Sequence, residues 1–254
     1  MTGVVAPVGR YREALAELPL RARLVDRARG AIVVVIGGSG WVDAALDAAS
    51  DGALGVVIAE PEFAPSGDVR RLAEALGFPV ILERPLLRTD AADDARAGRG
   101  GEAGWAAPRA VVVDGGASRS RLRSVARDAV GWVRVLSGDL PELVTPSGMP
   151  ALLETGAGVP ATLSVAATAR AGGGWLRAQA LGEVITEVDV EGRMSRLTTA
   201  TVAGRLIAPT RFESSERLAV RRALAAVETG EEPHDIDDLR ADTELVERML
   251  PSAP

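Results

Sequence analysis

The stretch VILERPLLR at residues 80–88 decides the fold, because an apolar strand stops there on a charged pair and a proline. Pro85 has no backbone N–H to donate to a sheet, so the strand should end before it and present Glu83 and Arg84 at its carboxyl end. In an open α/β sheet, ligands bind at that end of the strands. We therefore expect a nucleotide-type fold upstream of this stretch.

The first part of the chain alternates strand and helix patterns, which predicts a parallel sheet with right-handed crossovers. The clearest strand is AIVVVI at residues 31–36, because its continuous β-branched run is typical of a strand covered on both faces. The other expected strands lie within 3–11, 22–26, 53–61, 78–82 and 109–116, although 22–26 would suit a helix equally well, and the expected helices lie at 11–18, 41–50 and 68–76. Residues 89–108 have no strong periodicity and are expected to form a loop or a frayed helix.

The rest of the chain has a different pattern. A helix is expected at 118–137, with Gly138 as its stop, and strands joined by short glycine turns follow it. These strands are expected at 160–169, 175–181, 183–190 and 194–209, and closing helices at 214–229 and 235–250. The prediction is an α/β Rossmann-like parallel sheet domain, residues 1–116, followed by an α+β domain, residues 117–254, with a large and mostly antiparallel sheet.

Two glycine regions are candidates for binding a phosphate. The turn after the first strand keeps only Gly9 and contains Pro7, so it is a poor dinucleotide fingerprint. Gly37 and Gly38 lie between the clearest strand and the next helix, where backbone N–H groups could cradle a phosphate. A tight strand-to-helix turn needs glycine without any ligand, so both interpretations of this second region stay open.

Missing residue types exclude several chemistries. The 29 basic residues are all Arg, Cys is absent and His234 is the single histidine. The chain therefore has no disulfide, thiolate nucleophile, lysine Schiff base or histidine cluster, and we expect no metal site. His234 stands at a helix entrance, where a capping or surface role is expected. A net charge of −6 argues against nucleic acid or an anionic membrane as partner. The sequence has no apolar run long enough to span a bilayer and no signal-peptide pattern, so a cytoplasmic protein is expected.

Three short motifs, in order, resemble those of the Gfo/Idh/MocA family of sugar and polyol dehydrogenases. IAEP at residues 58–61 is similar to the family's Ala-Thr-Pro turn, and Glu83-Arg84-Pro85 is similar to its Glu-Lys-Pro motif. ETGEEP at residues 228–233, before an acidic helix start, is similar to its carboxyl-terminal pattern. The resemblance implies an NAD or NADP cofactor, although the cofactor could have been lost. The implied cofactor-binding residues are Gly9, Gly37, Gly38, Glu60, Pro61 and Glu83.

The departures from this family fall where its chemistry lies. Arg84 stands in place of the motif lysine, and a guanidinium stays protonated at physiological pH. The family's catalytic histidine and the carboxylate three residues after it correspond to Asp128 and Gly131. The resemblance therefore implies degenerate catalytic positions at Arg84, Asp128 and Gly131.

The leading hypothesis is a non-catalytic structural or regulatory subunit of this family. Its expected partner is a second copy, or an active paralogue, bound through the open face of the carboxyl-terminal sheet. One alternative is an active NAD(P)-dependent dehydrogenase of a sugar or polyol that uses Asp128, Glu83 or Tyr11, since burial can raise the pKa of a carboxylate enough for it to act as a base. Another is a protein that binds a small-molecule ligand near residues 37–40 and Glu60-Pro61.

Overall fold

A computed structural model describes residues 1–251 apart from residues 8, 76, 102–103, 146 and 170–172. It divides the chain into two compact units. Unit 1 contains Met1–Arg84 and Phe212–Arg240, and unit 2 contains Pro85–Arg211 and Ala241–Pro254. This division differs from the boundary expected after residue 116, because the chain leaves unit 1 at the Glu83-Arg84-Pro85 motif and later returns to it.

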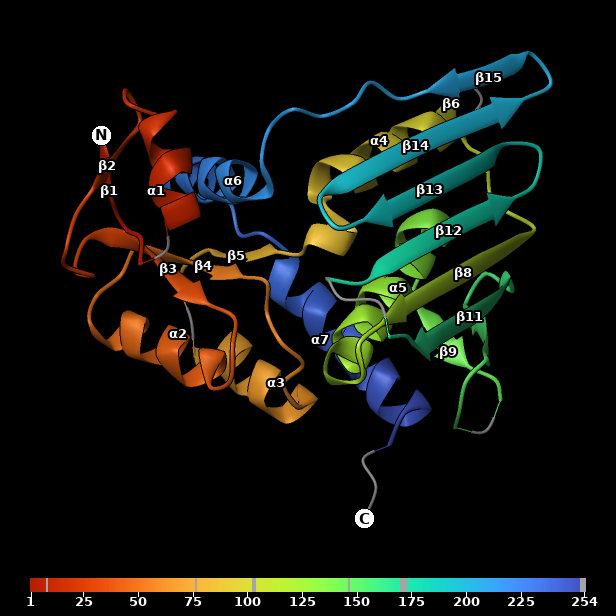
Figure 1. Cartoon of the computed structure of the whole chain (residues 1–254), viewed down its shortest axis with the longest axis horizontal. Helices are drawn as coiled ribbons and strands as arrows, with labels where there is room; N and C mark the ends of the chain where they lie inside the picture. Colours follow the sequence, from red (N-terminus) through yellow and green to blue (C-terminus); the bar gives the residue numbers. More distant parts are fainter. Residues whose placement is uncertain (8, 76, 102–103, 146, 170–172, 252–254) are drawn as a thin grey trace. The chain divides into compact units, whose positions relative to one another are not determined.

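Unit 1 is built on a five-stranded parallel sheet (Figure 1). The strand order is β2-β1-β3-β4-β5, and every neighbouring pair is parallel. The strands are β1 (Thr2–Val5), β2 (Ala22–Leu24), β3 (Ala31–Ile36), β4 (Gly55–Ala59) and β5 (Val80–Glu83). The Rossmann-like parallel sheet expected from the sequence is confirmed, and β5 ends on Glu83.

Helices cover both faces of this sheet (Figure 1). The helices α1 (Gly9–Ala16) and α6 (Ser215–Thr229) pack on one face, in a core that joins Leu15 and Leu224 to Ile32 and Val57. The helices α2 (Trp41–Ser50) and α3 (Ser66–Ala75) pack on the other face, together with Leu239 from the first half of α7 (Asp235–Met249). The helix α6 was expected in the second domain, but its apolar side covers the first sheet.

The connection between β2 and β3 is unusually short. It consists of residues 25–30 and contains no helix, whereas parallel crossovers generally use a dozen or more residues. The Val25 N–H donates to the Val4 carbonyl at 3.0 Å, and a Cβ on Gly3 would meet Val25 Cγ2 at 3.0 Å. The connection therefore lies directly against β1, on the face opposite to Val4.

Unit 2 contains an eight-stranded sheet with the order β15-β14-β13-β12-β8-β11-β10-β9. Its strands are β8 (Ala110–Ala117), β9 (Pro141–Leu143), β10 (Ala151–Thr155), β11 (Pro160–Ala167), β12 (Trp175–Leu181), β13 (Ile185–Glu191), β14 (Met194–Thr201) and β15 (Gly204–Ile207). All pairs are antiparallel except β8 with β11. The expected large and mostly antiparallel sheet is therefore confirmed.

Three details of unit 2 correct the sequence-based expectations. The strand expected at 109–116 is β8, which lies between β11 and β12 in the second sheet and not at the edge of the first. Residues 89–108 contain an ordered helix, α4 (Thr89–Arg99), and a small two-stranded sheet of β6 (Gly100–Gly101) and β7 (Gly104–Trp105). The single strand expected at 194–209 is the hairpin of β14 and β15, whose turn lies at residues 202–203.

The helix α5 (Leu122–Ser137) packs on the eight-stranded sheet against β8, β11 and β12, and α4 packs against β13 and β14. Two 3-10 turns precede these helices, η1 (Pro85–Leu87) and η2 (Arg119–Arg121). The buried Trp132 donates its indole N–H to the Leu86 carbonyl at 2.7 Å, so α5 holds η1 in place. None of the helices in the described part of the chain has the length and apolar character needed to cross a membrane.

Candidate functional site

The carboxyl ends of the strands in unit 1 form the expected binding edge. The connection after β1 leads to β2 on one side, whereas the connection after β3 leads to β4 on the other side. In open α/β sheets, ligands bind in the crevice at such a switch point, outside the carboxyl ends of the strands. Gly9 follows β1 and Gly37 follows β3, so the glycines of both regions singled out in the sequence lie at this switch point.

Backbone contacts bring most of the predicted cofactor-binding residues together at this edge. The Gly37 N–H donates to the Ala59 carbonyl at 2.8 Å, and the Glu60 N–H donates to the Glu83 carbonyl at 3.0 Å. Gly38 and Pro61 are the next residues along the two segments. Gly9 is the first residue of α1, next to Arg10, which reaches Glu60 at 3.5 Å.

The glycines at this edge differ in how much space a side chain would have. A Cβ on Gly37 would lie 2.4 Å from the Ala59 carbonyl oxygen and 2.5 Å from Pro61 Cα, so the neighbouring backbone alone requires a glycine there. A Cβ on Gly9 or Gly38 would meet nothing within 4 Å. The tight turn alone therefore explains why residue 37 is a glycine, without any ligand. Beside Gly38 there is open space.

Six polar residues form a connected group that we name the carboxyl-edge cluster: Arg10, Tyr11, Glu60, Glu83, Ser215 and Glu216. They come from α1, from the ends of β4 and β5, and from the first turn of α6. At the centre of the cluster, the Tyr11 hydroxyl donates to Glu83 Oε2 at 3.0 Å and the Ser215 hydroxyl donates to Glu83 Oε1 at 2.5 Å. Each Glu83 oxygen is therefore engaged by a hydroxyl of the protein itself.

The electrostatics of this centre follow from its burial. Glu83 is 4% exposed and Tyr11 is 2% exposed. Loss of hydration raises the pKa of Glu83 above its ordinary value of 4.5, although the hydrogen bonds from Ser215 and Tyr11 act in the opposite direction. Burial and the neighbouring Glu83 carboxylate raise the pKa of Tyr11 far above its ordinary value of 10.0. Tyr11 therefore keeps its proton at neutral pH and serves Glu83 as a donor only.

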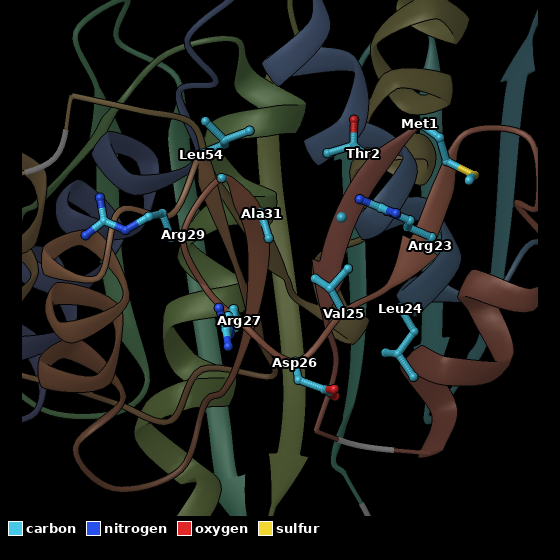
Figure 2. A pocket seen from close by; sticks show the side chains of 12 residues that line it. Met1, Thr2, Arg23, Leu24, Val25, Asp26, Arg27, Arg29, Ala31 and Leu54 are labelled. Carbon is cyan, nitrogen blue, oxygen red and sulfur yellow. The ribbon is translucent and has the colours of Figure 1, made fainter.

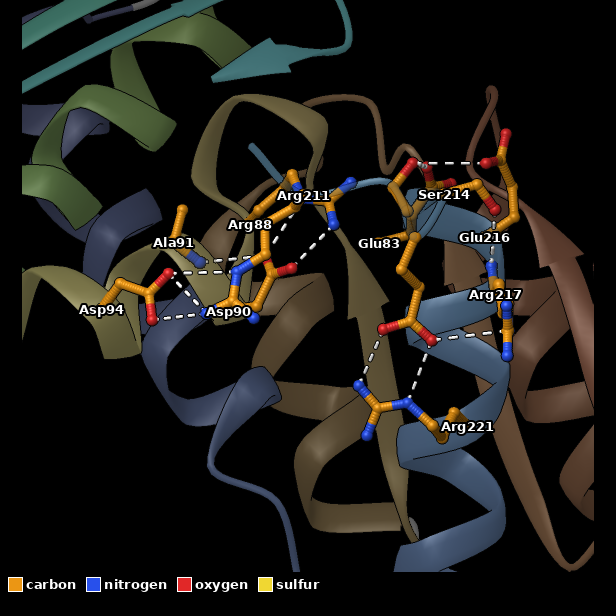
Figure 3. A network of polar contacts seen from close by, with 12 residues as sticks. Glu83, Arg88, Asp90, Ala91, Asp94, Arg211, Ser214, Glu216, Arg217 and Arg221 are labelled. Carbon is orange, nitrogen blue, oxygen red and sulfur yellow. Dashed lines mark hydrogen bonds and ion pairs between the residues drawn. The ribbon is translucent and has the colours of Figure 1, made fainter. Parts of the chain in front are cut away.

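Arg10 links the other two carboxylates of the cluster. Its Nη1 lies 3.3 Å from the buried Glu216 Oε1 and 3.5 Å from Glu60 Oε1. Glu216 is in the first turn of α6, where the helix dipole favours a negative charge, and the Ser214 side chain caps the same helix by accepting from the Arg217 N–H at 3.1 Å (Figure 3). The cluster thus holds three carboxylates and one guanidinium.

This arrangement does not fit the pyrophosphate of a dinucleotide well. Backbone N–H donors and an excess of positive charge bind phosphate, but Pro7 has no N–H and the cluster carries an excess of carboxylates. The single guanidinium of the cluster already contacts two of them. No group of His, Asp or Glu side chains among the described residues is arranged to hold a metal ion.

The three predicted catalytic positions lie around the boundary of unit 1 and on α5. Arg84 follows Glu83 and is buried. Asp128 and Gly131 are both buried on α5, as the resemblance implied for that helix. Asp128 Oδ1 lies 3.4 Å from Arg127 Nη2, so this carboxylate faces a permanent cation. Gly131 offers no side chain that could act.

His234 lies at the opposite edge of the unit 1 sheet. It lines a cavity of about 220 Å³ with Phe78 and Pro79, which precede the amino end of β5. Its carbonyl accepts the Asp238 N–H at 2.9 Å at the start of α7. The histidine is therefore at a helix entrance, as expected, and it lies near the amino end of β5, whereas Glu83 is at the carboxyl end.

Sequence reasoning missed Arg10, Ser215 and Glu216. Ser215 lies 132 positions after the glutamate it contacts, and no local pattern connects the two. The only available signal was the Ser-Ser-Glu start of the helix at 214–229, which predicts a cap but not the sheet edge that the cap faces.

No family model and no curated protein matches the sequence. Solved structures match it in fold. The 3-ketoreductase KijD10 from Actinomadura kijaniata, in complex with NADP, is 16% identical, with 97% of this chain and 95% of that chain covered and a TM-score of 0.62. The aldose-aldose oxidoreductase from Caulobacter crescentus, complexed with glycerol, is 14% identical over 97% and 87% of the two chains, with a TM-score of 0.66.

The UDP-N-acetylglucosamine 3-dehydrogenase GnnA from Acidithiobacillus ferrooxidans is 14% identical over 96% of this chain and 94% of that chain, with a TM-score of 0.57. Each of these matches spans both units. The chain therefore has the two-sheet fold of the Gfo/Idh/MocA-type oxidoreductases, which is the fold that the sequence motifs implied.

Proposed function

We propose that this chain is a degenerate member of the Gfo/Idh/MocA family that keeps the fold of the oxidoreductase and has lost its proton chemistry, and that it acts as a structural or regulatory subunit. The observation that carries the proposal is the engagement of Glu83. Its two oxygens accept from Tyr11 and Ser215, and it is buried. A general base must reach the proton that it removes. Both oxygens of Glu83 already accept hydrogen bonds from the protein, so neither is directed toward a substrate.

The other candidate acid–base groups support the same proposal. Arg84 is permanently protonated, Asp128 faces Arg127, and Gly131 has no side chain. His234 is at the amino end of β5, away from the binding edge. Arg84 and Gly131 cannot act as a base, Asp128 lies against a guanidinium, and His234 lies away from the binding edge.

A nicotinamide dinucleotide is the ligand class that this fold would take, since a structural neighbour was solved with NADP. In this chain, three carboxylates of the carboxyl-edge cluster stand where the phosphates would approach. Like charges at such a site oppose binding, so we expect weak binding of NAD and NADP at best.

The expected partner surface is the face of the eight-stranded sheet opposite α4 and α5. Alternate residues of its strands carry polar side chains there, joined by ion pairs such as Arg177 with Asp189 at 2.5 Å and Arg205 with Glu187 at 3.1 Å. An open, flat sheet face of this kind would be covered by a second copy or by an active paralogue. Size-exclusion chromatography with light scattering should give a dimer, and a monomer at micromolar concentration would contradict this assignment.

A thermal-shift comparison tests the proposal on the purified full chain. Samples without nucleotide, with NAD and with NADP are expected to unfold at the same temperature, because ligand that does not bind cannot stabilise. In the same samples, aldoses and polyols should give no nucleotide reduction. Turnover with any of them would contradict the proposal.

One observation favours a second candidate, an active dehydrogenase that uses Glu83. Burial raises the pKa of this carboxyl, as is common for catalytic acids and bases. Under this candidate, the chain would reduce NAD or NADP, and Glu83→Gln would abolish that reaction. Stabilisation by a nucleotide without turnover would instead favour the third possibility, a protein that binds a small ligand beside Gly38.

A further inference from the structure

A groove of about 710 Å³ lies beside the short connection between β2 and β3 (Figure 2). We name it the crossover groove, and its lining includes Thr2, Arg23, Leu24, Arg27, Arg29 and Leu54. Thr2, Ala31 and Leu54 mark the amino ends of β1, β3 and β4. The crossover groove is therefore at the opposite edge of the sheet from the carboxyl-edge cluster.

The crossover groove concentrates positive charge that the protein does not use. Arg23, Arg27 and Arg29 are exposed, and within the described residues none of them makes a hydrogen bond or an ion pair. Other arginines of unit 1 are paired: Arg21 contacts Glu228 at 2.5 Å and Arg222 contacts Asp235 at 2.6 Å. Three unpaired guanidinium groups around one groove are a notable concentration on a chain of net charge −6.

The crossover groove contains a single acidic lining residue, Asp26. In Figure 2 its carboxylate points away from Arg23, which extends from β2 toward the middle of the view. Asp26 therefore leaves the groove with an excess of positive charge. Planar guanidinium groups bind phosphate oxygens through two parallel hydrogen bonds, so this excess suits a phosphate better than a single carboxylate.

The crossover groove also offers apolar surface. Leu54 is 43% exposed and lines it from the start of β4, whereas the side chain of Leu24 lies on the other face of β2 from that of Arg23. The volume lies in the range of small-molecule sites, about 300 to 1,000 Å³. Phosphates alone would leave Leu54 in contact with water, whereas a ligand with a flat or apolar body would cover it.

We infer that the crossover groove binds a small ligand with a terminal polyphosphate and an apolar or planar body, a nucleoside triphosphate being the simplest example; the pyrophosphate of NAD and NADP is internal, so these dinucleotides are not expected to bind there. Arg23 and Arg27 hold the phosphates, and Leu54 contacts the body. The site lies outside the crevice at the carboxyl ends of the strands, and it does not depend on whether the chain is an active oxidoreductase.

Isothermal titration of the full chain with ATP, and separately with inorganic tripolyphosphate, tests the inference. ATP is expected to bind more tightly than tripolyphosphate, because only ATP covers Leu54. Arg23→Gln and Arg27→Gln are each expected to weaken ATP binding about fivefold, which is the scale of one exposed charge-assisted contact. The double variant should lose more than tenfold. Arg248→Gln removes an exposed charge on α7, outside the groove, and should change nothing.

Several results would overturn the inference. These are no binding of ATP, equal binding of tripolyphosphate and ATP, and ATP binding that the double variant leaves intact, which would place the nucleotide elsewhere. Leu54→Glu provides a second variant that introduces repulsion at a half-exposed position. It should abolish ATP binding while the unfolding temperature stays within about 2 °C of the unmodified chain, as for most surface substitutions.

Discussion

Tyr11→Phe is the sharpest perturbation of the carboxyl-edge cluster. The substitution keeps the buried ring and removes only the hydroxyl that donates to Glu83 Oε2 at 3.0 Å. Because Tyr11 is 2% exposed, water cannot easily replace the lost donor. The variant therefore reports how much of the stability of unit 1 depends on holding a carboxylate at this buried position.

The expected magnitude follows from the charge of the acceptor. A hydrogen bond to a buried charged group contributes about 1.5 to 3 kcal/mol, and removing one donor leaves the acceptor undersatisfied. We therefore expect a loss of about 2 kcal/mol in the free energy of unfolding at pH 7, which corresponds to about 4–8 °C for a chain of this size. The Tyr11 bond lowers the pKa of Glu83, so the variant raises that pKa further.

The loss of unfolding free energy in Tyr11→Phe should depend on pH. Since the native pKa of Glu83 lies above 4.5, the native state keeps the proton to higher pH than the unfolded state, and stability falls as pH rises through that window. In Tyr11→Phe the fall should extend to higher pH. The two proteins should therefore differ least below pH 4.5, where Glu83 is protonated in both states, and most at neutral pH.

Urea unfolding at a series of pH values measures both effects. Ser50→Ala is the control, because it removes an exposed hydroxyl that donates to the Leu46 carbonyl at 3.1 Å and should cost less than about 0.5 kcal/mol. A loss in Tyr11→Phe no larger than in this control, or a loss that does not change with pH, would refute the buried and charged state of Glu83.

Three further predictions concern unit 1. Glu83→Gln removes the titrating group and should flatten the fall of stability above pH 4.5, which chemical unfolding across pH would detect; an unchanged slope would assign the titration to another residue. Asp235→Ala leaves both Arg222 and an edge N–H of β5 without their carboxylate and should cost about 2–3 kcal/mol of unfolding free energy, whereas a cost below 1 kcal/mol would show that water replaces it. Gly37→Ala should cost about 1–3 kcal/mol because its Cβ meets fixed backbone, while Gly38→Ala, in open space, should cost less than about 0.5 kcal/mol, and equal thermal shifts for the two would contradict the packing.

The sequence was most informative where a single residue type controls the backbone. Pro85 stops a strand for a covalent reason, and β5 does end on Glu83. The β-branched run AIVVVI at residues 31–36 is typical of a strand covered on both faces, and it forms β3 with those bounds. The end of a strand at a proline and a β-branched strand both depend on residues adjacent in the sequence, so both can be predicted before the fold is known.

Partner choice between sheets could not be recognised in the same way. The apolar run that forms β8 would suit the edge of the parallel sheet or the centre of the second sheet equally well. Its place between β11 and β12 is fixed by contacts with strands that come more than forty residues later in the chain. For α6, the apolar stripe showed that one side is buried but not that it covers the parallel sheet.

The candidate site shows the same limit. The strand pattern placed Glu83 at the carboxyl edge of the sheet, and the family resemblance implied Glu60 and Gly37 as residues of the same binding region. It did not show that Tyr11 and Ser215 occupy the two oxygens of Glu83, because those contacts join residues 72 and 132 positions apart. The chemistry of the edge depends on these long-range pairs.

A single-turnover experiment tests the central claim most directly. The purified full chain is mixed in excess with NADP or NAD and an aldose or polyol, and nicotinamide absorbance is followed for hours, so that even very slow hydride transfer would be seen. We predict no reduced nucleotide above a blank without protein. Reduced nucleotide that forms with the unmodified chain and not with Glu83→Gln would contradict the claim that this oxidoreductase fold has lost its proton chemistry.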